Sequence, residues 1–236
     1  MIARRRWLGV AMAAALTVSS EAVGESLVET LLRVAGLTAA PGQLRDPGDV
    51  EAGSIWVANL GRQTVAPVTS DGGYRSPVFS PDGTLFALRG DAVVRIPGED
   101  ASPVSVQTVT GAVKLVGFDG RDADAVVVLV EDRRSPLAVL SLKTGRVVPL
   151  PYDRTSADQQ RLLAQIRGQR RLYGTTVLSV ETESKQGQLR ATEWTDVYLR
   201  RGEATPRNVS GCGGVSCGQP ALSPDGSKVA FVKTGG

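Results

Sequence analysis

The 236-residue sequence contains no histidine, and it has only two cysteines. Without an imidazole, neither a Ser-His-Asp or Cys-His catalytic site nor a His-ligated metal site can form. Aromatic residues are also sparse, at 5% of the chain. Because the sequence also lacks paired carboxylates at a suggestive spacing, we expect a protein that is not an enzyme and that uses no cofactor or metal.

The N-terminus lacks an apolar run long enough to span a membrane. Three arginines, Arg4–Arg6, precede an apolar run from Trp7 to Val18, whereas a spanning helix needs about 20 residues. Ala22 and Gly24 are small residues that suit a cleavage site. This layout is typical of a secretory signal peptide over residues 1–24, with Sec or twin-arginine export both open and a buried N-terminal helix as the alternative. We expect a periplasmic or secreted protein with no membrane span after cleavage.

The chain carries little excess charge once this segment is set aside. The whole sequence has a net charge of +3, and residues 1–24 contribute +2 through three arginines and Glu21. The remainder is therefore about +1 (3 − 2). A nucleic-acid partner is not expected, because such proteins concentrate positive charge on one surface.

The two cysteines, Cys212 and Cys217, lie close together in SGCGGVSCG. In an oxidising compartment such a pair usually forms a disulfide, and so short a loop gains only about 2 kcal/mol of stability. Free thiols are one alternative. A metal site is another, although it would need two further ligands and no histidine is available.

Two further parts of the chain follow the signal segment. Residues 25–53 combine a short helical stripe, ESLVETLLRVAGL, with an irregular stretch rich in Pro and Gly, and they predict a short helix and a linker arm. From residue 54 to residue 236, short β-rich runs alternate with Gly, Pro, Asp and Ser. This second part predicts an all-β domain.

The four-residue motif SPDG occurs twice, within PVFSPDGTLFAL at residues 77–88 and within PALSPDGSKVAF at residues 220–231. Its residues are Ser80, Pro81, Asp82 and Gly83 in one copy and Ser223, Pro224, Asp225 and Gly226 in the other. Pro suits the second position of a type I turn and Gly can adopt positive φ, so each copy predicts a hairpin with a glycine bulge. The two aspartates could also be read as calcium ligands, but their place in the turn explains them without a metal.

Between the two hairpins, the β-rich runs fall into sets of four. The first set continues after residue 88 with residues 91–98 and 103–109, and the second comprises residues 113–120, 124–131, 137–145 and 146–150. The third comprises residues 162–168, 175–183, 195–203 and 205–210, although residues 157–167 could equally form a helix. Four strands per repeat indicate a small β-propeller, and the sets predict four four-stranded blades.

The last SPDG hairpin provides only two strands, and residues 54–69 provide two more that lack partners of their own. We therefore expect circular closure, in which the N- and C-terminal strands share the closing blade. The two SPDG turns would then lie in neighbouring blades, on either side of this seam.

The repeat P-x-x-S-P-D-G-x-x-x-A-F resembles that of TolB-like β-propellers, which also have WD-like repeats. The resemblance covers residues 54–236 and is strongest at the two SPDG hairpins, since only Phe118-Asp119-Gly120 echoes the motif between them. It implies a periplasmic propeller that serves as a platform for protein binding. TolB's own N-terminal α/β domain has no counterpart in residues 25–53, and no G-x-S-x-G motif indicates the hydrolase domain that accompanies some such repeats.

One further cluster is a candidate partner surface. Arginines and a tyrosine gather in RLLAQIRGQRRLYG and could form a patch for an acidic protein surface: Arg161, Arg167, Arg170, Arg171 and Tyr173. A solvated loop explains them as well. The sequence thus favours a non-enzymatic protein-binding propeller, with a small-ligand or carbohydrate-binding propeller and a carboxylate- or metal-dependent enzyme as alternatives. The oligomeric state stays open.

Overall fold

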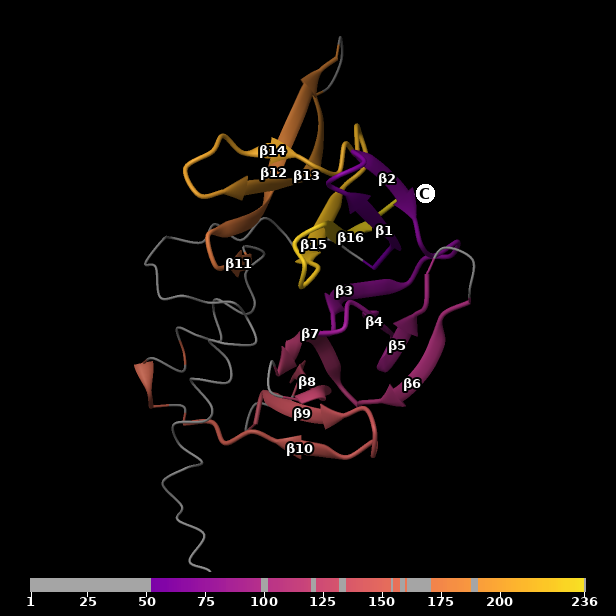
Figure 1. Cartoon of the computed structure of the whole chain (residues 1–236), viewed down its shortest axis with the longest axis vertical. Helices are drawn as coiled ribbons and strands as arrows, with labels where there is room; N and C mark the ends of the chain where they lie inside the picture. The colour runs from indigo at the N-terminus through magenta and orange to yellow at the C-terminus, as the bar shows by residue number, and fades with distance from the viewer. Residues whose placement is uncertain are drawn as a thin grey trace, which may run out of the picture.

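The fold is all-β, in four antiparallel four-stranded sheets (Figure 1). A computed structural model of the chain describes residues 52–98, 102–119, 122–131, 135–153, 155–157, 160, 171–187 and 191–235. The expected signal peptide and nearly all of the expected linker arm lie outside these residues. In the part of the chain that is described, no helix is long and apolar enough to cross a bilayer.

The four sheets are the blades of a small propeller, and three of them are continuous in sequence. Blade I consists of β3 (Tyr74–Phe79), β4 (Leu85–Arg89), β5 (Ala92–Ile96) and β6 (Val104–Thr108). Blade II consists of β7 (Ala112–Asp119), β8 (Asp122–Val130), β9 (Leu137–Ser141) and β10 (Val147–Pro149). Blade III consists of β11 (Arg171–Tyr173), β12 (Thr176–Gln186), β13 (Ala191–Arg201) and β14 (Arg207–Asn208).

The composite blade joins the two ends of the described chain. Its strand order is β15 (Cys217–Leu222), β16 (Lys228–Lys233), β1 (Ser54–Asn59) and β2 (Thr64–Pro67). β1 pairs with β16 in continuous antiparallel register, from Ser54 opposite Lys233 to Asn59 opposite Lys228. The predicted circular closure is therefore confirmed.

Glycine is required where the seam begins. A Cβ atom at Gly53 would lie 2.2 Å from the carbonyl oxygen of Lys233, so any other residue would force the two strands apart. The backbone of Gly53 also exchanges two hydrogen bonds of 2.9 Å with Tyr74 of blade I. One residue thus fixes β1 both to its sheet and to the neighbouring blade.

Both SPDG segments form the predicted turn. The N–H of Gly83 donates to the carbonyl oxygen of Ser80 at 2.9 Å, and Gly226 does the same to Ser223. Each glycine has positive φ, at 84° and 68°, which side-chain-bearing residues rarely adopt. The two turns lie in adjacent blades, because β15 and β16 pack against β3.

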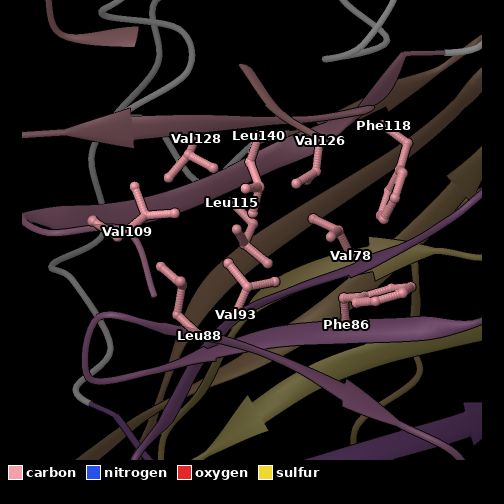
Figure 2. Close-up of a cluster of buried hydrophobic side chains, with 11 residues drawn as sticks. Val78, Phe86, Leu88, Val93, Val109, Leu115, Phe118, Val126, Val128 and Leu140 are labelled. Atoms are coloured by element: carbon pink, nitrogen blue, oxygen red, sulfur yellow. The ribbon is translucent and has the colours of Figure 1, made fainter. Parts of the chain in front are cut away.

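Apolar side chains fill the spaces between adjacent blades. Between blades I and II, a buried cluster draws on both sheets, and the rings of Phe86 and Phe118 lie 5.1 Å apart (Figure 2). A second cluster, including Ile55 and Val232, lies between the composite blade and blade I. A third, including Leu178 and Phe231, lies between the composite blade and blade III. Covering both faces of a sheet explains why the central strands are almost wholly apolar.

Burial decreases from the middle of each sheet to its outer strand. All residues of β4 except Arg89 are buried, whereas β10 is exposed throughout. The described strand contacts run from blade III to the composite blade, then to blade I and blade II. Within the described residues, blades II and III share no extensive strand packing of this kind, and the four blades follow an arc in Figure 1.

Blade III differs from the sequence-based expectation in two ways. Its described first strand is β11, at Arg171–Tyr173, whereas the segment expected there, residues 162–168, lies outside the described residues. Its two central strands are 11 residues long rather than the nine expected for each, and they pair along their whole length. From Glu181 onward β12 is mostly exposed, so this hairpin extends beyond the packed part of the blade (Figure 1).

Candidate functional site: the central cavity and its turns

The first strand of every blade contributes to one central cavity of about 520 Å³. Its wall contains Val78 of β3, Phe118 of β7, Tyr173 of β11 and Leu222 of β15. These strands are innermost, since β3 contacts both β7 and β15 and β15 contacts β11. The cavity is therefore the place where the four blades converge.

The second SPDG turn forms one side of this cavity, with Ser223, Pro224, Asp225 and Gly226 all in its lining. Asp225 accepts hydrogen bonds from the Ser223 hydroxyl at 2.6 Å, the Ser227 hydroxyl at 2.7 Å and the Ser227 N–H at 3.0 Å. The Ser223 bond is the largest of the influences that lower the pKa of Asp225 to about 2. The carboxylate is thus ionised at neutral pH and already has donors, so it is poorly suited to proton transfer there.

Asp82 occupies the same position in the first turn. Its carboxylate accepts hydrogen bonds from the Ser80 hydroxyl and, at 3.0 Å, from the Thr84 N–H. The bond from Ser80 is the main cause of the lowered pKa of Asp82. Within the described residues, no group of three or more Cys, Asp or Glu side chains is placed to hold a metal ion. The hydrogen bonds of Asp82 and Asp225 are therefore those that stabilise the two turns.

A second repeated feature links the inner strands across the seam. Ser76 and Gln219 both precede a proline, both lie at a bulge in their strand, and both have positive φ, at 51° and 53°. The Ser76 N–H donates to the side-chain oxygen of Gln219 at 2.5 Å. Because residues before proline favour extended conformations, the positive φ of these two residues could not be predicted from the SPDG motif.

The predicted disulfide is present between Cys212 and Cys217. Both residues are buried and belong to the apolar cluster between the composite blade and blade III. The bridge closes the loop that enters β15. It therefore supports the strand that begins the composite blade.

A buried carboxylate, which the sequence analysis missed, anchors the start of this loop. Asp196 is only 3% exposed. It accepts hydrogen bonds from the Cys212 N–H and the Ser210 hydroxyl, each at 2.7 Å, and from the Trp194 indole N–H at 2.9 Å. Burial alone would raise the pKa of Asp196, but these donors outweigh it and the pKa lies below its ordinary value. Asp196 acts on the position of the loop and does not line the central cavity.

Reduction of the disulfide should lower the free energy of unfolding by no more than about 2 kcal/mol, because the closed loop is short. We expect the reduced protein to remain folded, since the Asp196 hydrogen bonds still hold the loop. Urea unfolding followed by circular dichroism measures the loss. A loss well above this value would mean that the bridge, and not the carboxylate, is the main constraint on the loop.

The predicted arginine patch is only partly within the described residues. Arg161, Arg167 and Arg170 lie outside them. Arg171 lies in β11 opposite Leu178, and Tyr173 is half-buried in the wall of the central cavity. A patch joining all five residues remains a prediction.

Comparison with known proteins finds no family and only distant structural similarity. A search of protein-family models gives no match, and a search of curated protein sequences gives none either. Among solved structures, the chain is similar to a protein from Agrobacterium tumefaciens described as a TolB, with 19% identity and a TM-score of 0.32. That similarity covers 76% of this chain and 60% of the other. The AtxE2 isopeptidase in its apo form is 20% identical, with a TM-score of 0.28, over 72% of this chain and 27% of the isopeptidase.

The chain is an all-β protein with the fold of a small β-propeller, distantly similar in structure to a TolB. It spans less than two thirds of either structure. The assignment of the fold rests on the strand order of this chain itself.

Proposed function

We propose that this chain is an exported, non-enzymatic propeller that binds another protein at the turn-bearing mouth of its central cavity. The observation that carries the proposal is the convergence of all four blades on one cavity with an SPDG turn at its side. Apolar walls beside fixed turn backbone suit a protein partner, because interfaces combine an apolar centre with a polar rim.

The chemistry of the described lining favours binding over catalysis. Asp225 is its one carboxylate, and that group is ionised and held by two serines. The remaining lining is made up of apolar side chains, glycines, Ser223, Thr176 and the phenol of Tyr173. The one hydroxyl–carboxylate contact among these residues joins Ser223 to Asp225. Because the pKa of Asp225 is lowered to about 2, this carboxylate is too weak a base to activate the hydroxyl as a nucleophile.

Site-specific photo-crosslinking tests this function. A benzoylphenylalanine at Pro224, an exposed residue of the cavity lining, should give a discrete cross-linked protein in cells. The same probe at Ser70, an exposed residue that follows the C-terminal end of β2 and does not line the cavity, should give no such product. Equal products from both positions, or none from Pro224, would contradict binding at the cavity mouth.

A small ligand is the second candidate, and the size of the cavity favours it. A volume of about 520 Å³ falls within the range of about 300–1,000 Å³ typical of ligand pockets. Native mass spectrometry of protein purified from its source would then reveal a bound molecule of fixed mass. Such a molecule, together with a failure to cross-link any protein, would replace the first proposal with this one.

Export to the periplasm forms part of the proposal. The Cys212–Cys217 disulfide suggests an oxidising compartment, and the first 24 residues have the layout of a signal peptide. We expect the mature chain to begin near Glu25 and to contain no thiol that can be alkylated. N-terminal sequencing and mass spectrometry of the periplasmic fraction measure both properties. Cytosolic protein that retains Met1 and two free thiols would contradict export.

A further inference from the structure

A second cavity, of about 790 Å³, lies between the composite blade and blade I. We call it the seam groove. Alternate residues of β1 and β2, among them Val57, Thr64 and Ala66, line its composite side, because side chains two positions apart share a face of a strand. Val68, just after β2, continues this side. Phe79 and Ile96 line its blade I side. Val57, Val68 and Phe79 rest on the apolar cluster between these blades, so the groove has an apolar floor over a rigid support.

Three cations from three different elements line the same groove: Arg62, Arg95 and Lys228. The Arg62 N–H is held by the side chain of Asn59 at 3.0 Å, in the turn between β1 and β2. The Lys228 N–H is held by the Ser223 hydroxyl at 2.9 Å, at the start of β16, and Arg95 lies within β5 opposite Phe86. Closure of the composite blade thus brings Arg62 and Lys228 together from opposite ends of the described chain.

The positive charge of the groove is not neutralised within the described residues. The described ion pair joins Arg89 to Asp71, away from this groove. Asp82 is the one carboxylate among the described lining residues, and its pKa is lowered mainly by the hydrogen bond from Ser80. Three cations against one carboxylate leave a net charge of +2 (3 − 1) over the described lining.

We infer that the seam groove binds an extended, acidic segment of a partner protein, with alternate apolar side chains on the floor and carboxylates on the three cations. An extended strand presents its side chains alternately to opposite sides, which matches an apolar floor below a cationic rim. A simple anion would leave the floor exposed to water, whereas a purely apolar segment would leave the cations without a counter-charge. This inference extends the proposed protein-binding function to a site separate from the central cavity.

A fluorescein-labelled octapeptide of alternating acidic residues and leucine tests the inference, with fluorescence anisotropy of the full chain as the readout. We expect saturable binding that weakens as salt rises, because the contacts are solvent-exposed charges. The same peptide with Asn and Gln in place of Asp and Glu should bind at least about tenfold more weakly. Inorganic phosphate that binds as tightly as the peptide would overturn the inference in favour of a simple anion site.

The matched variants locate the peptide. Arg62→Gln, Arg95→Gln and Lys228→Gln together should weaken binding about tenfold, since the variant loses three exposed ion pairs with the peptide, each of small effect. The control removes three exposed cations elsewhere, by Lys143→Gln, Arg146→Gln and Lys185→Gln, and should bind as the wild type does. All six side chains are exposed, so circular dichroism should show both variants folded.

The two proposals fail in different ways. Equal weakening by both triple variants would overturn the groove assignment, because it would indicate general attraction to a basic surface. Loss of peptide binding in Pro224→Trp, with normal binding in the groove variant, would move the peptide to the central cavity and leave the proposed function standing. Absence of peptide binding would also overturn the inference.

Discussion

Deletion of residues 54–69 should abolish the folded state. The deletion removes β1 and β2. It therefore removes the strand that pairs with β16 along its whole length, from Lys228 to Lys233. It also removes Ile55, which is completely buried in the cluster between the composite blade and blade I. Burial of one such side chain contributes about 1.5–3 kcal/mol, against a total stability of about 5–15 kcal/mol for a domain. Loss of two strands and their hydrogen bonds exceeds that margin.

Deletion of residues 25–50 is the matched control, because it is of greater length but removes none of the described strands. Thermal unfolding by circular dichroism and gel filtration should show a cooperative transition for this control and aggregation for the deletion of residues 54–69. If both deletions retained the same transition, β1 and β2 would be dispensable and the composite blade would be wrong.

A circular permutant separates strand connectivity from strand content. Because Ser54 lies opposite Lys233, a short Gly-Ser linker from Thr234 to Gly53 would make β16 and β1 an ordinary hairpin. New ends between β8 and β9 would move the seam into blade II without removing a described strand. We expect this permutant to fold, which would show that the deletion fails through lost pairing and not through disturbance of the chain end.

The fold could be predicted from the sequence because its signals are local and repeated. A Pro and a Gly at fixed positions specify each SPDG turn, and both turns formed as expected. The closure followed from strand counting: two unpaired strands at each end of residues 54–236 leave one economical solution. These inferences needed no knowledge of which side chains meet in space.

The cavities and the buried carboxylate could not be predicted in this way. Asp196 lies in TEWTDVYLRR, where it and Arg200 flank the apolar run Val197–Leu199, so it resembles a charged residue at the exposed end of a strand. It is buried only because the loop from Ser210 to Cys212 folds over it. The seam groove likewise depends on Arg62 and Lys228 meeting across the closure. Such contacts between distant segments leave no periodic signal in the sequence.

The second large effect concerns Asp196. Asp196→Ala should lower the free energy of unfolding by about 2–6 kcal/mol, because the buried Cys212 N–H and Ser210 hydroxyl would each lose an acceptor at about 1–3 kcal/mol. Asp196→Asn should cost less, since its amide oxygen can still accept from these donors while its NH₂ group faces the Trp194 N–H. Urea unfolding at pH 7 should therefore rank the wild type above Asn and Asn above Ala.

The dependence on pH distinguishes loss of a charged acceptor from loss of packing. The pKa of Asp196 in the folded protein lies below its ordinary value, so its carboxylate stabilises the fold fully above the unfolded pKa of about 3.9. That contribution disappears as the pH falls through the lower, folded pKa. The gap in stability between the wild type and Asp196→Ala should therefore be constant from pH 7 to about pH 5 and should narrow below about pH 4. A gap that stays constant down to pH 2, with both proteins still folding cooperatively, would assign the effect to packing and not to the ionised carboxylate that holds the Cys212 loop.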